Sequence, residues 1–301
     1  MTRSRRSGKM PPVSERVEIR PMTPEDVDAA YLVNSLALAD SPEERELVYS
    51  RGADETERRK ELYRHVLAAD PEGCFVAEDG GRVVGSALSA RREGVWILVL
   101  FAMEEGYRGS GVGERLISRA LDYGERCSGG MIASSHHPGA MRRYALAGFD
   151  LRPTLMASGA VSRERLPVVK DIRQENDLEL AAQVDRSLRG AAHGPDMEFL
   201  TRNDGRLLVA DRADGRGYAA LWHGAPRLVA ATSEAIAADL LRAGLAESTE
   251  ERVEVRWITA GQIWAVRVAL EAGLSLSPAG PICTRGKLGP LAPYLPSGPF
   301  L

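Results

Sequence analysis

An unbroken apolar run at residues 95–102 marks the centre of the hydrophobic pattern of this chain. Its length and its β-branched residues are typical of a buried strand. Residues 114–121 follow a different period, because their apolar side chains recur at helical spacing. Between the two segments lies a hexapeptide, residues 108–113, in which every second residue from position 109 is glycine. The pattern predicts a strand, a glycine-rich loop and a helix in succession.

The same two periods predict further elements around this segment. Thr23 followed by Pro24 and two acids is typical of a helix start, since Thr caps a helix and Pro suits its first turn. Asp-Gly-Gly at residues 79–81 predicts a hairpin turn. The acid-rich insert at residues 40–54 predicts a solvated surface. The predicted strands are residues 17–20, 74–78, 82–90, 95–102, 131–134 and 149–157, and the predicted helices are residues 23–39, 55–69, 113–127 and 138–147.

The second half of the chain repeats this plan in weaker form, which implies two copies of one fold. Residues 262–274 match residues 137–149 best, with Ala265 answering Ala140 and Gly273 answering Gly148. The other segments that mirror the first half are a strand at residues 168–173, a helix at 176–188, a hairpin at 206–210 and 217–222, and a central strand at 227–231. After this last strand Thr232 or Ser233 would cap an ordinary helix, without a glycine loop.

A strand that runs through closely spaced glycines into a helix presents backbone N–H groups and the positive end of the helix dipole. Such a point favours an anion, most plausibly a phosphate, and a Cβ at Gly109, Gly111 or Gly113 would hold its oxygens away. A Walker loop is excluded because Glu114 and Arg115 follow the last glycine. A dinucleotide fingerprint is excluded because its glycine spacing differs.

The loop resembles the acetyl-CoA loop of the GCN5-related N-acetyltransferases (GNAT), in which Arg or Gln, two residues, and Gly-x-Gly or Gly-x-Ala follow a strand. Arg108, Gly111 and Gly113 match that motif position by position. A later family motif also recurs in order, and the matching residues are Ala140, Tyr144, Gly148 and Phe149, with His137 where Asn is common. An ordinary glycine turn would not require this second motif.

The resemblance implies an α/β (α+β) protein of two tandem GNAT folds, each with a mixed, mostly antiparallel central sheet flanked by helices. It divides the chain into a leader at residues 1–14, an acetyl-CoA domain at 15–160 and a degenerate GNAT-like domain at 161–301. The cosubstrate implied is acetyl-CoA, without a metal. The resemblance assigns pantetheine contacts to the backbone of Phe101 and Met103, and a further cofactor contact to His137. It assigns the phosphate contacts to Arg108, Gly109, Ser110, Gly111, Val112 and Gly113.

Tyr144 is the candidate general acid, because a phenol at the sulfur atom can protonate the leaving thiolate. A structural role for Tyr144 as an amphipathic core residue is the alternative. The general base stays open, since the apolar strand carries no carboxylate. The candidates are Glu104, Glu105, His136, His137 and His193, and by resemblance a chain-end carboxylate beside Phe300 and Leu301. The second copy has Ala269 at the Tyr144 position and is interpreted as a structural or acceptor-binding partner.

Composition narrows the class of protein and the compartment that we expect for it. The chain has 301 residues, a net charge of -3 and 44% hydrophobic residues, which fits a two-domain protein without affinity for nucleic acid or membrane. Three scattered cysteines form neither a zinc motif nor a disulfide framework, so a cytoplasmic setting is expected. The basic leader lacks the apolar segment of a signal peptide and is expected to be disordered.

The sequence predicts an acyltransferase that moves an acetyl group from acetyl-CoA to a primary amine of a small molecule, as a monomer or homodimer. A protein or peptide acceptor is the alternative within the class. A catalytically silent CoA-binding sensor or scaffold is the alternative from another class, because the central strand lacks a carboxylate.

Overall fold

The computed structural model describes residues 13–39, 41–202 and 204–301, so most of the predicted leader lies outside the described residues. The chain forms two compact units. The first consists of Met1–Ser89 and Leu100–Tyr123, and the second of Ala90–Val99 and Gly124–Leu301. These units divide the chain at other positions than the boundary at residue 160, which rests on the internal repeat and stays a prediction.

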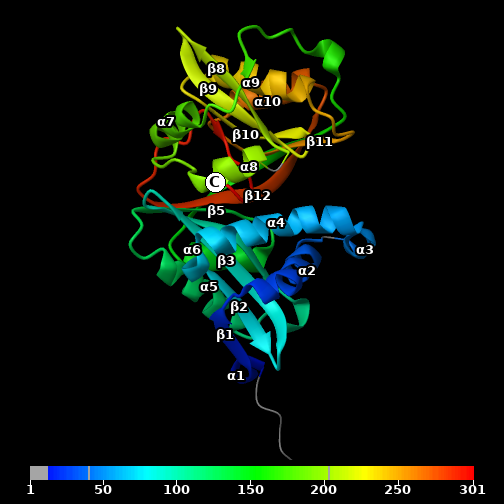
Figure 1. Ribbon diagram of the computed structural model, residues 1–301, viewed down its shortest axis with the longest axis vertical. Coiled ribbons are helices and arrows are strands. Elements are labelled where there is room, and N and C mark those ends of the chain that lie inside the picture. Colours follow the sequence, from blue (N-terminus) through cyan, green and yellow to red (C-terminus); the bar gives the residue numbers. More distant parts are fainter. Residues whose placement is uncertain (1–12, 40, 203) are drawn as a thin grey trace, which may run out of the picture. The chain divides into compact units, whose positions relative to one another are not determined.

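In the first part of the chain a group of helices follows the first strand, and three consecutive strands and a further helix come after it (Figure 1). Its elements are α1 (Val13–Arg16), β1 (Val17–Pro21), η1 (Pro24–Asp26), α2 (Val27–Leu38), α3 (Pro42–Ser50), α4 (Ala53–Ala69), η2 (Pro71–Gly73), β2 (Cys74–Asp79), β3 (Arg82–Arg92), β4 (Val95–Met103), η3 (Glu105–Tyr107) and α5 (Val112–Tyr123). The strands β3 and β4 have residues in both units.

The remaining elements all belong to the second unit. They are β5 (Gly129–Ala133), α6 (Pro138–Leu146), β6 (Asp150–Gly159), η4 (Arg163–Arg165), β7 (Arg173–Gln174), α7 (Leu178–Leu188), α8 (Pro195–Arg202), β8 (Arg206–Arg212), β9 (Gly215–Trp222), β10 (Ala225–Ala231), α9 (Glu234–Ala246), β11 (Val253–Thr259), α10 (Ile263–Glu271), β12 (Ser275–Gly286) and β13 (Tyr294–Leu295).

The predicted elements of the first half are confirmed to within a few residues, and two predictions need correction. The helix predicted to reach residue 127 ends at Tyr123, because Gly124 follows and the helix propensity of glycine is low. The strand predicted at residues 168–173 is reduced to β7, because Pro167 precedes it and Asp171 has a φ of +61° that breaks the extended run. The acid-rich insert forms α3, whose glutamates are exposed as predicted.

In the first unit β1 pairs with β2, and β2 with β3, all antiparallel. The β2–β3 turn holds Asp79 opposite Arg82, with φ values of +59° at Gly80 and +84° at Gly81, as a two-residue hairpin requires. α5 contacts β1 and β2. Side chains alternate between the two faces of a strand, and β3 is buried on both faces over nearly its whole length.

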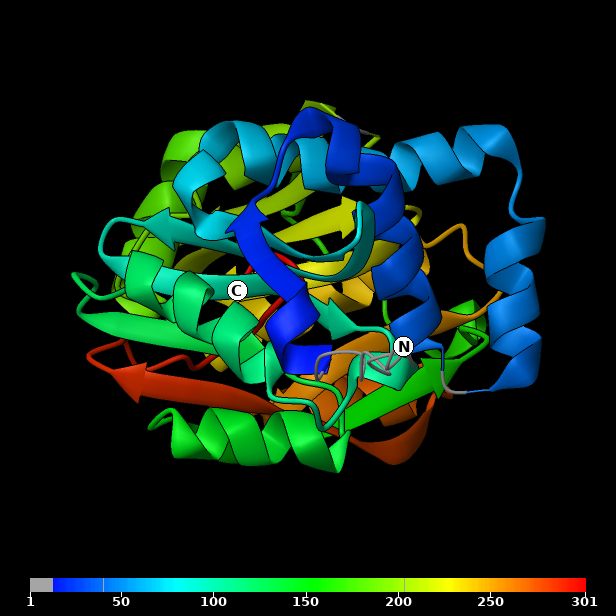
Figure 2. The ribbon, with the colours of Figure 1, turned by 90° about the horizontal axis from the view of Figure 1, so that it is seen from below.

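In the second unit a strand from the far end of the chain lies between β5 and β6 (Figure 2). β12 pairs antiparallel with β5, from Ile282 opposite Ala133 onwards, and with β6, from Ser275 opposite Ser158 onwards. The other edge of β6 pairs with β11. The first repeat therefore obtains one strand of its sheet from residues 275–286, which the sequence analysis had not assigned to any element.

A second sheet has the strand order β13-β10-β9-β8-β7 and is antiparallel throughout. α9 contacts β8, β9 and β10 on the face that carries Ala219 and Leu221. Tyr218 points to the opposite face, where its hydroxyl donates to Asp185 on α7. Because side chains alternate along a strand, α9 and α7 cover opposite faces of this sheet.

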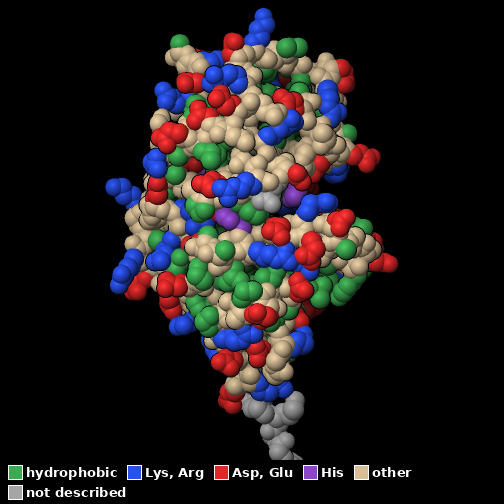
Figure 3. Space-filling model, viewed as in Figure 1, with side chains coloured by type: hydrophobic (Ala, Val, Ile, Leu, Met, Phe, Trp, Pro, Cys, Tyr) green, Lys and Arg blue, Asp and Glu red, His purple; other side chains and the backbone are tan. Residues whose placement is uncertain are grey.

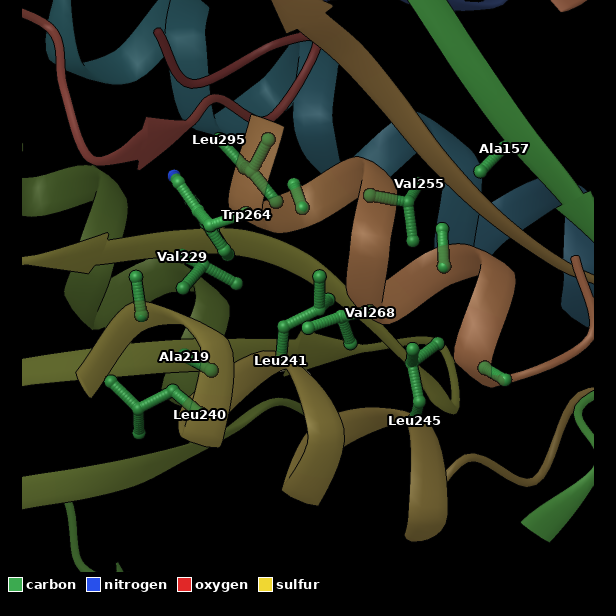
Figure 4. Packing of buried hydrophobic residues seen from close by; sticks show 14 of the residues in the cluster. Ala157, Ala219, Val229, Leu240, Leu241, Leu245, Val255, Trp264, Val268 and Leu295 are labelled. Carbon is green, nitrogen blue, oxygen red and sulfur yellow. The ribbon is translucent and has the colours of Figure 1, made fainter. Parts of the chain in front are cut away.

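The apolar core of the second unit lies between α9, α10 and the two groups of strands (Figure 4). Leu240, Leu241 and Leu245 of α9 and Trp264 and Val268 of α10 point into it, and each is at most 4% exposed. Strand residues from β6, β9, β10 and β11 face them. Full burial of a large apolar side chain stabilises the fold by about 1.5–3 kcal/mol.

Candidate functional site

The loop that follows β4 holds two glycines in a backbone conformation that other residues rarely adopt. φ is +77° at Gly109 and +85° at Gly111, in the left-handed region that favours glycine. A Cβ built on either residue would meet no atom within 4 Å. The space beside both glycines is therefore open, and backbone atoms form this surface of the loop.

Several amide groups of this loop have no acceptor. Ser110 closes the turn through its side chain, because its Oγ donates to the carbonyl of Tyr107 at 2.6 Å. Within this loop, the N–H groups of Gly109, Ser110, Gly111 and Gly113 have no acceptor among the described residues. They fall within five residues at the N-terminus of α5, where the helix dipole is positive. Such a group of donors suits an anion, and in particular a phosphate.

Two arginines flank the loop. Arg108 is exposed, and its Nη2 lies 3.4 Å from the carbonyl of Ala37. Arg115, one turn into α5, donates from Nη1 to the carbonyl of Ser14 at 2.6 Å. Both guanidinium groups bind only carbonyl oxygens among the described residues, so their charges are not neutralised by a carboxylate contact. Both arginines therefore add to the positive electrostatic potential at the N-terminus of α5.

The backbone of β4 presents alternate residues to its two edges. Glu104 N donates to the carbonyl of Val84 on β3 at 2.9 Å, so residues of even number face β3 at this end. Phe101 and Met103 therefore direct their backbone groups to the opposite edge. On that edge β5 pairs with β4 only from Val95 to Leu98. The last five residues of β4 run on beyond this parallel pairing.

Tyr144 is buried within the second unit. It lies on α6, is 5% exposed, and no described residue hydrogen-bonds its hydroxyl. Burial raises the pKa of this phenol well above its ordinary value of 10.0, with a smaller contribution from Cys283 on β12. Tyr144 therefore keeps its proton at neutral pH, as a general acid must.

The residues after Tyr144 explain the Gly-Phe pair of the sequence motif. Gly148 adopts a φ of +82° and ends α6, while Phe149 N donates to the carbonyl of Tyr144 at 3.1 Å. The same cap recurs in the second half, where Gly273 also has a φ of +82° and Leu274 N donates to the carbonyl of Ala269 at 2.9 Å. The equivalence of the two helices is thus structural, and Ala269 occupies the position of Tyr144.

His137 has a structural contact that the sequence analysis did not predict. Its side chain is the N-cap of α6, since Nδ1 accepts a hydrogen bond from Gly139 N at 3.2 Å. The residue is exposed, as is His136. Capping orients the first turn of α6 and leaves Nε2 of His137 pointing away from the cap.

The candidates for the general base are mostly engaged elsewhere. Glu104 accepts a hydrogen bond from Arg82, and Glu105 pairs with Arg45 at 3.4 Å. His193 is 1% exposed and lies 2.6 Å from Asp185 through Nδ1. Phe300 is buried against Phe199 and Trp222, which confirms that this end of the chain packs in an apolar environment.

The sequence analysis singled out His193 but missed the buried polar residues around it. They are Asp185 and Arg189 of α7, Tyr218 of β9 and Tyr294 of β13. A signal was present in the sequence, because Asp185 and Arg189 lie one turn apart on the face of α7 that also carries Val184 and Leu188. Charged residues on an apolar face of a helix indicate a buried polar site.

The turn after β10 in the second half of the chain differs from the glycine loop after β4 in the first half. After β10, Ser233 caps α9 by accepting from Ile236 N, which confirms the ordinary cap predicted there. Thr232 Oγ1 accepts a hydrogen bond from Arg216 N at 3.0 Å. A Cβ on Gly215 would lie 2.9 Å from Thr232 Oγ1 and 3.0 Å from Ser233 Oγ. This turn therefore has hydroxyl side chains, and no glycine, at the start of the helix that follows the strand.

Residues 38–149 match the profile of the acetyltransferase (GNAT) family. They contain the strand, the open glycine loop and the Tyr-x-x-x-Gly-Phe helix end described above. Residues 38–149 form a GNAT-family acetyltransferase domain. This match supports an acyltransferase domain at these residues, and enzymes of the GNAT family bind an acyl-CoA and an acceptor. A comparison with curated proteins found no match.

Solved structures with the same fold extend over nearly the whole chain. A candidate acetyltransferase from Pyrococcus horikoshii aligns with 91% of this chain and 90% of its own, with 17% identity and a TM-score of 0.72. A tandem GNAT protein from the clavulanic acid biosynthesis pathway aligns with 90% of this chain and 98% of its own, with 14% identity and a TM-score of 0.57. A GCN5-related N-acetyltransferase from Sphaerobacter thermophilus aligns with 90% and 96%, with 14% identity and a TM-score of 0.54.

The surface of the protein is mixed in charge. Acidic and basic side chains intersperse over the described residues on the face seen in Figure 3. Among the helices of residues 13–39, 41–202 and 204–301, none is both long and apolar enough to cross a bilayer. The same residues contain no cluster of three His, Cys, Asp or Glu side chains that could hold a metal ion.

Proposed function

We propose that this protein transfers the acetyl group of acetyl-CoA to a primary amine of a small molecule. The observation that carries the proposal is the loop after β4, with two glycines at positive φ, open space beside both, and four amides without an acceptor. A turn that served only to cap α5 would need neither the space nor the amides. The pyrophosphate of CoA has the charge and the oxygen spacing for this cradle.

The chain supplies binding groups for each part of the cosubstrate. Amides of the loop from Arg108 to Gly113 would hold the pyrophosphate, with the Arg108 guanidinium and the α5 dipole adding positive potential. The edge of β4 toward which Phe101 and Met103 direct their backbone would pair with the pantetheine amides, as an added strand does. His137, with its Nδ1 engaged in the cap, would offer Nε2 to the cofactor. Acetyl-CoA supplies an activated thioester.

Tyr144 would donate the proton that the departing thiolate needs. Its phenol stays protonated at neutral pH because burial raises its pKa, and no described residue competes for the hydroxyl. The amine must reach the thioester unprotonated, and a base is not assigned, because Glu104 and Glu105 are paired with arginines. The proposed acceptor is the primary amine of a small molecule, and a protein or peptide acceptor is the alternative within the class.

The second half would have no acetyl-CoA site of its own. The turn between β10 and α9 contains Thr232 and Ser233 in place of glycines, and the residue at the Tyr144 position is Ala269. The edge of β10 that is not paired with β9 is covered by the chain itself, because β13 pairs with Val229 and Ala230. A tandem arrangement with one active half follows, in which the second half is a structural or acceptor-binding partner.

A silent CoA-binding sensor or scaffold is the second candidate. One observation favours it: β4 carries no carboxylate between Val95 and Met103, and the next acid, Glu104, is paired with Arg82. A sensor would bind acetyl-CoA through the same loop without releasing its thiol.

The thermal unfolding midpoint with and without acetyl-CoA tests the cofactor loop. A ligand that binds the native state alone raises the midpoint by mass action, so the parent should gain stability and Gly111→Glu should not. Gly81→Glu is the matched control, because Gly81 has nearly the same φ, +84°, and equally open surroundings. A midpoint that acetyl-CoA leaves unchanged in the parent would remove the proposed cosubstrate.

Release of free thiol from acetyl-CoA across a panel of amines then separates the two candidates. The proposed enzyme should release thiol in the presence of at least one small primary amine, with the product carrying one added acetyl group by mass. Binding without release across the panel, and across a matching panel of peptides, would favour the sensor.

A further inference from the structure

Arg189 is a buried cation held at the end of α7 in the second unit. It is the C-cap residue of α7 and is 0% exposed. Its backbone is fixed, because its N–H donates to the carbonyl of Asp185 and its own carbonyl accepts from Gly289 N. One nitrogen of its guanidinium, Nη1, donates to the carbonyl of Ala191 at 2.8 Å. The position of the side chain is therefore determined by contacts on two sides.

The other two nitrogens of this guanidinium have no acceptor. Nε and Nη2 of Arg189 are buried and make no hydrogen bond with any described residue. These two N–H groups lie side by side and form the fork with which arginine binds a carboxylate in a bidentate manner. Leaving charged donors unsatisfied in the interior is more unfavourable than leaving neutral donors unsatisfied.

The same unit shows what such a fork binds when it is occupied. Arg92 donates from Nε and Nη2 to the two oxygens of Asp196 at 2.8 and 2.6 Å, and both side chains are at most 5% exposed. Arg186, on α7 itself, holds Glu93 with the same two nitrogens. Arg189 presents this fork without its carboxylate.

The nearest carboxylate of the chain is already engaged. Asp185 accepts from the Tyr218 hydroxyl at 2.5 Å and lies 2.6 Å from His193 Nδ1. His193 Nε2 in turn lies 3.3 Å from the Tyr294 hydroxyl. Burial raises the pKa of Tyr294, while the charge of Arg189 and a hydrogen bond with its side chain oppose that rise, so the guanidinium contacts this hydroxyl. The fork is thus surrounded by polar groups, namely hydroxyl, imidazole and carboxylate. These groups form hydrogen bonds mainly with one another.

We propose that the Arg189 fork binds the carboxylate of a small organic acid. A planar carboxylate matches the two parallel N–H groups in a bidentate manner, and it brings less negative charge into the interior than a phosphate would. The Tyr294 hydroxyl lies beside the fork and supplies a further polar contact. The ligand enters through a local opening of the chain around Arg189, since the residue has no exposed surface in the closed state.

Formate is the probe, because it is the smallest carboxylate and needs the least space. The thermal unfolding midpoint of the full chain is measured in a sodium formate titration at constant ionic strength, against formamide as the neutral isostere. Formate should raise the midpoint in a saturable manner and formamide should not. Equal midpoints in formate and in chloride would overturn the proposal and leave ordered water as the partner of the fork.

Two variants locate the effect. Arg189→Lys keeps the charge but cannot form the fork, so it should lose the formate response. Arg186→Lys is the control on the same helix, and it should keep the response because its fork is exposed and paired with Glu93. A response that persists in Arg189→Lys would place formate elsewhere and refute the site.

The formate response of the parent alone decides the question if Arg189→Lys does not fold. In that case Gly111→Glu, which alters the acetyl-CoA loop, should still respond to formate. A formate response lost in Gly111→Glu would assign the carboxylate to the acetyl-CoA loop and overturn the Arg189 site. Loss of acetyl-CoA binding with the formate response retained would leave the Arg189 site standing while the proposed function fails.

Discussion

Single residues decide the candidate chemistry of this chain through burial. Tyr144 carries a hydroxyl on a side chain that is 5% exposed, and its burial keeps the phenol neutral far above neutral pH. Gly109 and Gly111 act in the opposite way, since they contribute no side chain and leave the amides accessible. The residue proposed to give a proton is therefore buried, while the residues proposed to bind the anion are open.

Tyr144→Phe should retain acetyl-CoA binding and lose turnover. The substitution removes one hydroxyl that no described residue hydrogen-bonds, so stability should change little, whereas loss of a general acid costs about 100-fold or more in rate. Steady-state thiol release and the acetyl-CoA shift of the unfolding midpoint measure the two effects. Tyr49→Phe, at an exposed tyrosine, is the control. Unchanged turnover in Tyr144→Phe would return Tyr144 to a packing role.

A second effect at this scale concerns the buried pair of Arg92 and Asp196. Asp196→Ala leaves the Arg92 charge buried without its bidentate partner, so unfolding free energy should fall by about 3–5 kcal/mol. Glu198→Ala is the control on the same helix, α8, since the Glu198–Arg202 pair is exposed and should change stability by less than about 1 kcal/mol. Urea unfolding of both variants measures the difference. Equal effects would mean that burial of the pair is not what makes it strong.

At the scale of elements, the pairing of β12 determines how the two halves of the sequence depend on each other. β12 is encoded after residue 274 but lies between β5 and β6, which are encoded before residue 160. Without it, β5 and β6 would each present an unpaired edge of apolar residues. The N-terminal repeat is therefore incomplete as a sheet when it is taken alone.

A chain that ends at residue 160 should fail to fold, while one in which Gly159 is joined to Leu274 and continues through β12 should fold. Ser158 lies opposite Ser275, so Gly159 and Leu274 would form a two-residue hairpin loop between β6 and β12. Solubility, circular dichroism and a cooperative thermal transition measure the outcome. A soluble, cooperative chain that ends at residue 160 would show that β12 is dispensable for the first repeat.

At the scale of the whole molecule, ionisable groups buried in the neutral form set the response to alkali. Burial raises the pKa of the Cys74 and Cys283 thiols from 9.0 to about 12, and it raises the pKa of Tyr63, Tyr144 and Tyr294 above 10.0. Their folded-state pKa values are raised, so the unfolded chain loses these protons first. The stability they contribute is complete below about pH 9 and is lost as the pH rises toward about 12.

The unfolding free energy should therefore fall above about pH 9, where the thiols of the unfolded chain titrate, and more steeply above about pH 10, where its tyrosines join them, by at most about 1.4 kcal/mol for each titrating group and each pH unit. Urea unfolding at a series of alkaline pH values measures the slope. Cys283→Ala should reduce the slope in its lower part, because one thiol no longer titrates. A flat profile would mean that these groups are not buried in the neutral form.

The sequence by itself determined the local features of this protein. Strand and helix periods, the Thr23 and Ser233 caps, the Gly80–Gly81 turn and the glycine loop depend on neighbouring residues and were predictable, as was the family that the loop resembles. Only the tertiary structure decided which strands pair with one another. A period of two marks a strand but not its partner, so the place of β12 between β5 and β6 and of β13 beside β10 was not encoded locally. The empty fork of Arg189 also emerged only there, because an acceptor is a non-local contact.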